Sequence, residues 1–169
     1  MMHTAQSFSN FNGEQWEYVC EKKECLIGIN NYIQDKEGKK NPFLTTYVQI
    51  ISASKKKLDL VDKENQTYKL GEEKLNVTQI FVTFPLNIDL RVKPLIRLGK
   101  KQISGFTFLY CNAKIGCKAS LSMTTEVVEL FKKEKEMAVI FRGFGSSKIL
   151  EFKFPLKGFS KSYDKLLKT

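Results

Sequence analysis

Four cysteines in two close pairs are the residues whose spacing most directly suggests chemistry. Cys20 and Cys25 lie in the stretch CEKKEC, and Cys111 and Cys117 lie in the stretch CNAKIGC. Four cysteines allow three disulfide pairings, and the sequence alone does not choose among them. Pairing within each stretch is the simplest arrangement, because each spacing suits two strand ends that flank a turn. Structural disulfides would indicate an oxidising compartment.

Zinc binding and redox catalysis are the alternatives for these cysteines. Zinc ligands are usually about two to four residues apart and often include histidine, whereas these pairs are spaced differently and no histidine lies near them. A redox-active pair would have the spacing Cys-x-x-Cys, which is absent from the sequence. The sequence therefore favours two structural disulfides, with no metal and no cofactor expected.

Histidine is the second residue type that limits the chemistry. The chain has one, His3, close to its first residue. Serine nucleophiles and general acid–base sites commonly depend on histidine. A Ser–Lys site could be drawn from many serine and lysine pairs, so such a choice carries little information. We therefore expect a non-enzymatic protein that binds or scaffolds, with a hydrolase whose site escapes recognition as the alternative.

The charge of the chain is strongly positive. The sequence has 28 Lys and Arg against 18 Asp and Glu, which gives +10, and 25 of the basic residues are lysines spread along the chain. Nucleic-acid recognition usually relies on arginine, whose planar fork matches phosphates and guanine. We expect contact with anionic surfaces rather than with nucleic acid. The candidate contact surface, basic or along a strand edge, comprises Arg91, Lys93, Arg97, Lys100 and Lys101.

Many short stretches of alternating, aromatic or β-branched residues predict a mainly β fold. We expect an antiparallel β-sandwich or a barrel-like domain. Two short helices are predicted, one near residues 124–135 and one at the C-terminus near residues 159–168. Trp16, Phe106 and Phe108 are interpreted as interior residues of this domain.

Three parts of the predicted strand pattern are irregular. Residues 52–57 are polar and predict a turn, so residues 58–60 and 67–70 are expected to be separate, short edge strands. Residues 91–98 alternate in polarity but contain Pro94, which cannot donate a ladder hydrogen bond. They are therefore expected to form an edge strand or a bulged strand.

The chain shows no internal repeat and no linker, so residues 14–169 are expected to form a single domain. Residues 1–13 are mostly polar and are expected to be a flexible N-terminal arm. No apolar run approaches the ~20 residues of a membrane-spanning helix, and the start of the chain lacks the apolar core of a secretory signal. We expect the mature part of an exported protein whose signal peptide has been removed.

Several motifs together resemble a known family. Trp16 stands four residues before the first cysteine, and FPL follows a hydrophobic strand at 84–86. The more specific elements are GCKA at 116–119 and LKGFS at 156–160. Over residues 14–168 this chain resembles the invasion associated locus B family of Gram-negative bacteria. It differs in having Asn87 where family members often have glycine, and a charged run at 132–136 where the first helix usually ends in glycine.

The resemblance implies an exported protein of the periplasm or cell envelope, surface-exposed or secreted, associated with entry into host erythrocytes. It implies no enzymatic activity, and it makes the four cysteines structural. The partners implied are a host-cell surface or an envelope component, without a transmembrane segment. The alternative is a periplasmic chaperone-like or envelope-stress factor that contacts bacterial proteins through an exposed strand, with residues 91–98 as the candidate edge.

Overall fold

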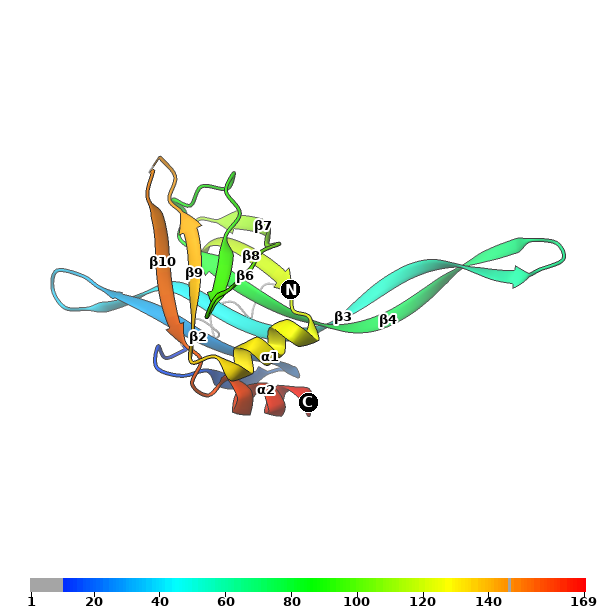
Figure 1. Cartoon of the computed structure of the whole chain (residues 1–169), viewed down its shortest axis with the longest axis horizontal. Coiled ribbons are helices and arrows are strands. Elements are labelled where there is room, and N and C mark those ends of the chain that lie inside the picture. Colours follow the sequence, from blue (N-terminus) through cyan, green and yellow to red (C-terminus); the bar gives the residue numbers. More distant parts are fainter. Residues whose placement is uncertain (1–10, 146) are drawn as a thin grey trace.

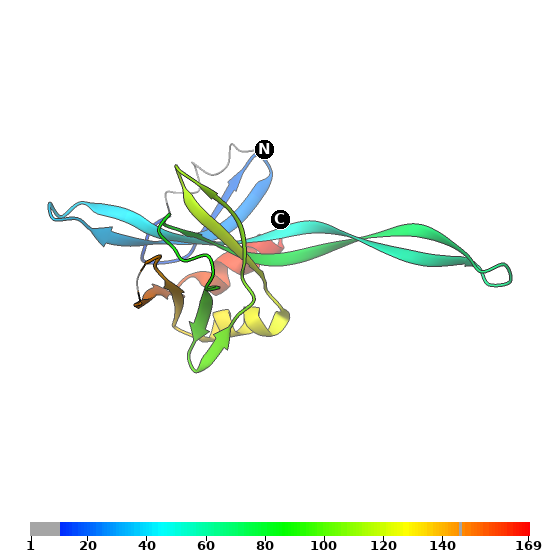
Figure 2. The same cartoon turned by 90° about the horizontal axis from the view of Figure 1, so that it is seen from above.

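The computed structural model of the protein describes residues 11–145 and 147–169, which form two packed antiparallel sheets and two helices (Figures 1 and 2). The first sheet has the order β1-β2-β3-β4-β8-β7 and the second the order β10-β9-β5-β6. Neither sheet closes on itself within the described residues, so the predicted sandwich is confirmed and the barrel alternative is wrong. The strands of the first sheet are β1 (Glu17–Glu21), β2 (Glu24–Gln34), β3 (Lys40–Asp62), β4 (Thr67–Phe84), β8 (Gly116–Ser122) and β7 (Thr107–Asn112). Those of the second are β10 (Ile149–Pro155), β9 (Glu136–Arg142), β5 (Leu95–Leu98) and β6 (Lys101–Ile103).

Alternation along the strands builds the core between the two sheets. Leu44 and Val48 of β3 are buried, and so are Ile80 and Val82 of β4, because they point to the same face of the first sheet. These residues belong to one apolar cluster that also includes β5, β9, β10 and both helices. Trp16 and Phe106 are buried in it and Phe108 packs against it, so their interior placement is confirmed.

Both predicted helices are present. Helix α1 (Thr125–Lys133) begins after Thr124, whose hydroxyl oxygen accepts a hydrogen bond from the Val127 N–H. Helix α2 (Phe159–Leu167) follows Gly158 and packs against β1, β2 and β3 of the first sheet. No helix of the described residues is both long enough and apolar enough to span a membrane.

The LKGFS segment holds Trp16 in place. The Trp16 N–H donates to the Lys157 carbonyl at 2.9 Å, and the indole Nε1–H donates to the Pro155 carbonyl at 3.0 Å. Gly158 has φ of +81°, and a Cβ there would lie 2.9 Å from the Trp16 carbonyl oxygen. Phe159 packs edge-on against the indole at 5.1 Å between ring centroids. The LKGFS segment therefore packs the C-terminal part of the chain against Trp16, near the start of the described residues.

The β3–β4 pair is much longer than predicted. Residues 52–76 of this pair extend beyond the rest of the molecule as a twisted two-stranded ribbon, which both views show (Figures 1 and 2). We call these residues the hairpin extension. The expected turn at 52–57 and the separate edge strands at 58–60 and 67–70 are therefore wrong. The polar composition reflects a ribbon exposed on both faces, in which the β3–β4 register continues from the body of the sheet.

The prediction of a flexible N-terminal arm is wrong for its last three residues, 11–13. Phe11 is buried, and its ring lies over Gly28, where a Cβ would approach the ring to 2.4 Å. The Asn30 N–H also donates to the Asn12 carbonyl at 3.0 Å. Residues 11–13 are thus fastened to β2, while the remainder of the predicted arm, residues 1–10, lies outside the described residues.

The expected edge strand at residues 91–98 is also wrong. Strand β5 pairs with β9 on one side and with β6 on the other, so the edges of the second sheet are β6 and β10. Arg91 and Lys93 lie in the loop before β5. Pro94 comes directly before the strand, where its missing N–H removes no ladder bond. The chaperone-like alternative therefore loses the strand edge on which it was based.

Candidate contact surfaces

The two disulfides fasten both edges of the six-stranded sheet. Cys20 of β1 is bonded to Cys25 of β2, and Cys111 of β7 is bonded to Cys117 of β8. Strands β1 and β7 are the two edge strands of that sheet, and each disulfide joins directly paired residues. This is the local pairing that the sequence favoured. It uses all four sulfur atoms, which leaves no thiolate for the zinc alternative.

Arg91, the first residue of the predicted basic surface, is held by a buried carboxylate. Its Nε–H and Nη2–H donate to the two oxygens of Asp89 at 2.9 and 3.0 Å. These hydrogen bonds lower the pKa of Asp89 to about 2. The guanidinium also lies 5.8 Å from the ring centroid of Phe144, in the loop after β9. Arg91 therefore fastens two loops together, and much of its charge is already matched.

The other predicted basic residues are divided between different surroundings. Arg97 of β5 forms a bidentate ion pair with Glu151 of β10. Lys93 and Lys100 are exposed, and Lys101 opens β6. The structure thus separates the five residues into two arginines paired with carboxylates and three accessible lysines, rather than one continuous basic surface.

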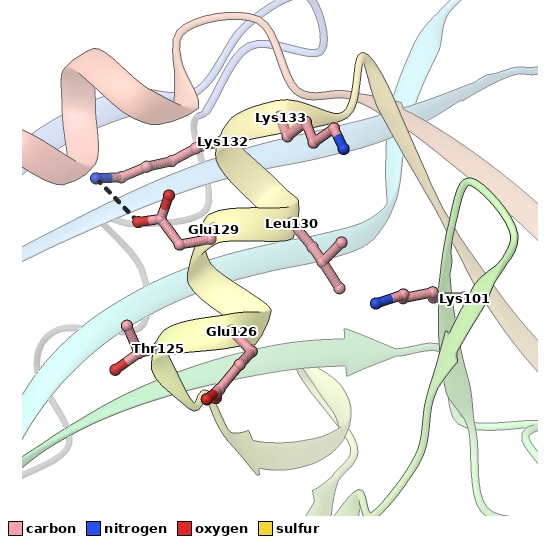
Figure 3. A pocket seen from close by; sticks show the side chains of 7 residues that line it. All are labelled: Lys101, Thr125, Glu126, Glu129, Leu130, Lys132 and Lys133. Atoms are coloured by element: carbon pink, nitrogen blue, oxygen red, sulfur yellow. Dashed lines mark ion pairs between the residues drawn. The ribbon is translucent and has the colours of Figure 1, made fainter.

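Lys101 lies at a shallow hollow beside α1, of about 650 Å³ (Figure 3). Lys132 bridges Glu129 at 3.9 Å and Asp164 of α2 at 3.3 Å. The charges lining this hollow are mixed, as its full lining shows: Lys101, Thr125, Glu126, Glu129, Leu130, Lys132 and Lys133. Within the described ranges, no three His, Cys, Asp or Glu side chains are grouped to hold a metal. The hollow is suited to weak polar contact.

An aromatic group with a central lysine occupies the outer face of the first sheet. Tyr47 and Phe81 stack at 4.8 Å, and Lys118 donates to the Tyr47 hydroxyl at 2.7 Å. Burial raises the pKa of Tyr47, against the opposing effect of Lys118. Burial alone would lower the pKa of Lys118, but Tyr47 and Tyr110 raise it. This group was not predicted from the sequence, although Tyr47 and Phe81 alternate with the buried Val48 and Ile80.

Four exposed apolar side chains of the hairpin extension share one face, a pattern that was not predicted from the sequence, whereas Leu75, opposite Ala53, lies on the other face. Leu58 is paired with Leu70, and Leu60 is paired with Tyr68. Leu58 is 72% exposed and Leu70 is 65% exposed, while Leu60 is 46% exposed and Tyr68 is 60% exposed. The alternation of Leu58 and Leu60 with Lys57 and Asp59 was the available signal, since alternation is typical of a strand with one covered face.

These features define a disulfide-stapled β-sandwich with a projecting two-stranded ribbon. The chain belongs to the invasion associated locus B (IalB) protein family, whose model matches residues 52–167, including the whole hairpin extension. The fold is similar to the crystal structure of invasion associated protein B from Bartonella henselae, with a TM-score of 0.64 and 14% sequence identity. That match covers 90% of this chain and 92% of the other. No curated protein matches the sequence.

Proposed function

We propose that the protein is a non-enzymatic, exported protein of the bacterial envelope that supports association with host cells by binding. The observation that carries this proposal is the pair of disulfides that fasten both edges of the six-stranded sheet. Such bonds persist in oxidising compartments such as the periplasm and the cell surface. Family membership supplies the link with invasion, and erythrocytes are the host cells that we propose.

The compartment can be tested on the cysteines themselves. We expect protein recovered from the periplasmic or surface fraction of the producing bacterium to resist thiol alkylation until a reductant is added. Peptide mapping without reductant should recover Cys20 linked to Cys25, and Cys111 linked to Cys117. Freely alkylated cysteines in a cytoplasmic fraction would contradict the proposed localisation.

Binding is proposed to use the accessible lysines at the β5–β6 turn and α1, namely Lys100, Lys101 and Lys133, with Lys132 beside them. Clustered lysines attract anionic lipid headgroups and acidic glycans, and such attraction weakens as salt screens the charges. Because Glu126 and Glu129 lie in the same hollow, the attraction should be modest. Host-cell association would then depend on many weak contacts rather than on one deep pocket.

The functional experiment compares erythrocyte binding by the wild type, by K100E/K101E and by K36E/K39E. The last variant makes the same charge change in the exposed β2–β3 turn and is the matched control. We expect K100E/K101E to bind several-fold more weakly while the control binds as the wild type does. A strain lacking the gene should also enter erythrocytes less often. Absence of saturable binding, together with normal entry by that strain, would sink the proposal.

A further inference from the structure

The hairpin extension has two chemically different faces. Register pairing places Lys57 opposite Gly71 and Asp59 opposite Lys69 on one face, where the Lys57 ammonium lies 3.7 Å from the Asp59 carboxylate. The other face carries the four exposed apolar side chains at 58, 60, 68 and 70. The distal ribbon is therefore amphipathic, although no other part of the described chain covers its apolar face.

An amphipathic ribbon in this position needs a covering surface. An isolated two-stranded hairpin is at best marginally stable in water, and it gains stability when an apolar face is packed. Four large apolar side chains contiguous on one exposed face are also typical of an interaction site.

We propose that the apolar face of the hairpin extension packs against the same face of a second copy of this chain. Under a two-fold axis parallel to the strands, β3 of one ribbon lies over β4 of the other. Leu58 then faces Leu70 of the second copy, and Leu60 faces Tyr68 of the second copy. Each contact occurs twice, so the eight side chains form one small, closed apolar core. This inference is independent of the function proposed above.

Charge complementarity supports the second copy as the occupant. Lys56 is paired with Glu72 on the same face as the four apolar residues, one pair closer to the body. The same two-fold arrangement places Lys56 of each copy over Glu72 of the other. Pairing of the ribbons side by side through two β3 edges would instead bring two Lys55–Lys57 runs together, and repeated lysines discourage such edge pairing.

A lipid surface fits the ribbon less well. The tip of the hairpin is polar, since Asp62 accepts hydrogen bonds from the N–H groups of Glu64 and Asn65. Lys63 and Glu64 would have to enter the membrane before the apolar pairs could do so, and charged side chains are costly there. The ribbon is better suited to a protein face that meets it side-on.

The size of the contact predicts a weak dimer. The strands of the hairpin extension, residues 52–62 and 67–76, extend about 35 Å and together are about 10 Å wide, so the pair of ribbons buries roughly 700 Å² in total. This is below the standard range for stable complexes, and it indicates a dissociation constant between about 10 µM and 1 mM. Association should therefore be measured across that concentration range with the whole chain.

The decisive experiment is sedimentation of two single variants, K56E and E72K, alone and mixed. Each variant alone places like charges opposite each other between copies, so we expect at least a tenfold loss of dimer affinity. In the mixture, the carboxylates at positions 56 and 72 of the first variant face the ammonium groups at positions 72 and 56 of the second. Only pairing between copies is restored by mixing, because within each ribbon the charges stay alike. We therefore expect heterodimers with near wild-type affinity.

Matched apolar variants complete the test. L58S should weaken the dimer at least tenfold, whereas I149S should not, although Ile149 is exposed to the same extent, 71% against 72%. Unchanged circular dichroism and melting temperature would show that both remain folded. A wild type that is monomeric at about 1 mM, a mixture no better than its components, or assembly beyond a dimer would overturn the proposal. Binding of the wild type, but not of L58S, to anionic phosphatidylglycerol vesicles would overturn it in favour of a lipid occupant.

Discussion

Leu58 and Leu70 lie directly opposite each other in the β3–β4 pair, and both remain largely exposed. Counted along β3, Leu58 falls on the same alternate positions as Leu44 and Val48, which are buried in the body. The strand thus uses one alternation for two purposes. In the body it covers the core, and in the hairpin extension it presents an apolar face that the rest of the described chain leaves open.

Substitutions in the body and in the hairpin extension should differ in their effect on the free energy of unfolding. Replacing Ile80 with alanine removes buried side-chain volume and should lower the free energy of unfolding by about 2–5 kcal/mol. Replacing Leu58 with serine should change it by less than about 0.5 kcal/mol at low protein concentration. Denaturant titration of both variants at a few micromolar measures the difference. An equally large loss for Leu58→Ser would mean that the hairpin extension packs against the body.

The two disulfides should contribute similar amounts to the free energy of unfolding. Each closes a short loop, so removing either pair by C20S/C25S or C111S/C117S should cost about 2 kcal/mol through greater freedom of the unfolded chain. For a chain of this length that corresponds to roughly 4–8 °C in melting temperature. Thermal melts with and without reductant measure the effect. Serine variants that melt at the wild-type temperature would contradict this contribution.

Gly116 should tolerate no side chain. Its φ is +94°, and a Cβ would lie 1.9 Å from the Phe84 carbonyl oxygen. Gly38 also has positive φ, but a Cβ there would meet nothing within 4 Å. We expect Gly38→Ala to cost about 1 kcal/mol and Gly116→Ala more than about 3 kcal/mol. Equal losses, measured by denaturant titration, would show that close approach to β4 is not what requires this glycine.

Asp89 should make the fold sensitive to acid. Because hydrogen bonds from Arg91 lower its folded pKa to about 2, its contribution is full above the ordinary value near 3.9. That contribution is lost as the pH falls through about 2. The melting temperature of Asp89→Asn should therefore be lower than that of the wild type at pH 7, and this difference should become smaller below pH ~4.

Glu64→Gln is the control for this prediction, since it removes one carboxylate from the exposed hairpin tip. Its melting temperature should follow that of the wild type from pH 7 down to the acid range. A gap between Asp89→Asn and the wild type that stays constant down to pH ~2 would contradict the role assigned to the Asp89–Arg91 pair.

Local patterns predicted the parts of the fold that pack on a core. Helix α1 was predicted near residues 124–135, and in the structure it begins after Thr124, whose hydroxyl oxygen accepts the otherwise free N–H of Val127. Trp16 was interpreted as interior because large aromatic side chains are usually buried, and it is buried although β1 begins one residue after it. The hairpin extension was missed because Lys55–Lys57 resembles a turn, whereas the register of β3 on β4 continues through it. Register depends on strands far apart in sequence, and composition does not report it.

The predicted basic surface failed for a related reason. The positive charges of Arg91 and Arg97 were visible, but their carboxylate partners were not. Asp89 lies two residues away in a loop whose path the sequence does not reveal, and Glu151 comes from β10, more than fifty positions later. Tertiary pairing therefore decides which charges remain available for a partner.

Hydrogen exchange of the whole chain at two concentrations would detect packing of the hairpin extension against a second copy. At a concentration about tenfold above the dissociation constant found by sedimentation, amides of residues 56–60 and 68–72 should exchange several-fold more slowly than at about tenfold below it. Amides of β9, within the body, should exchange equally at both concentrations. Equal exchange of the hairpin extension at the two concentrations would contradict its packing against a second copy.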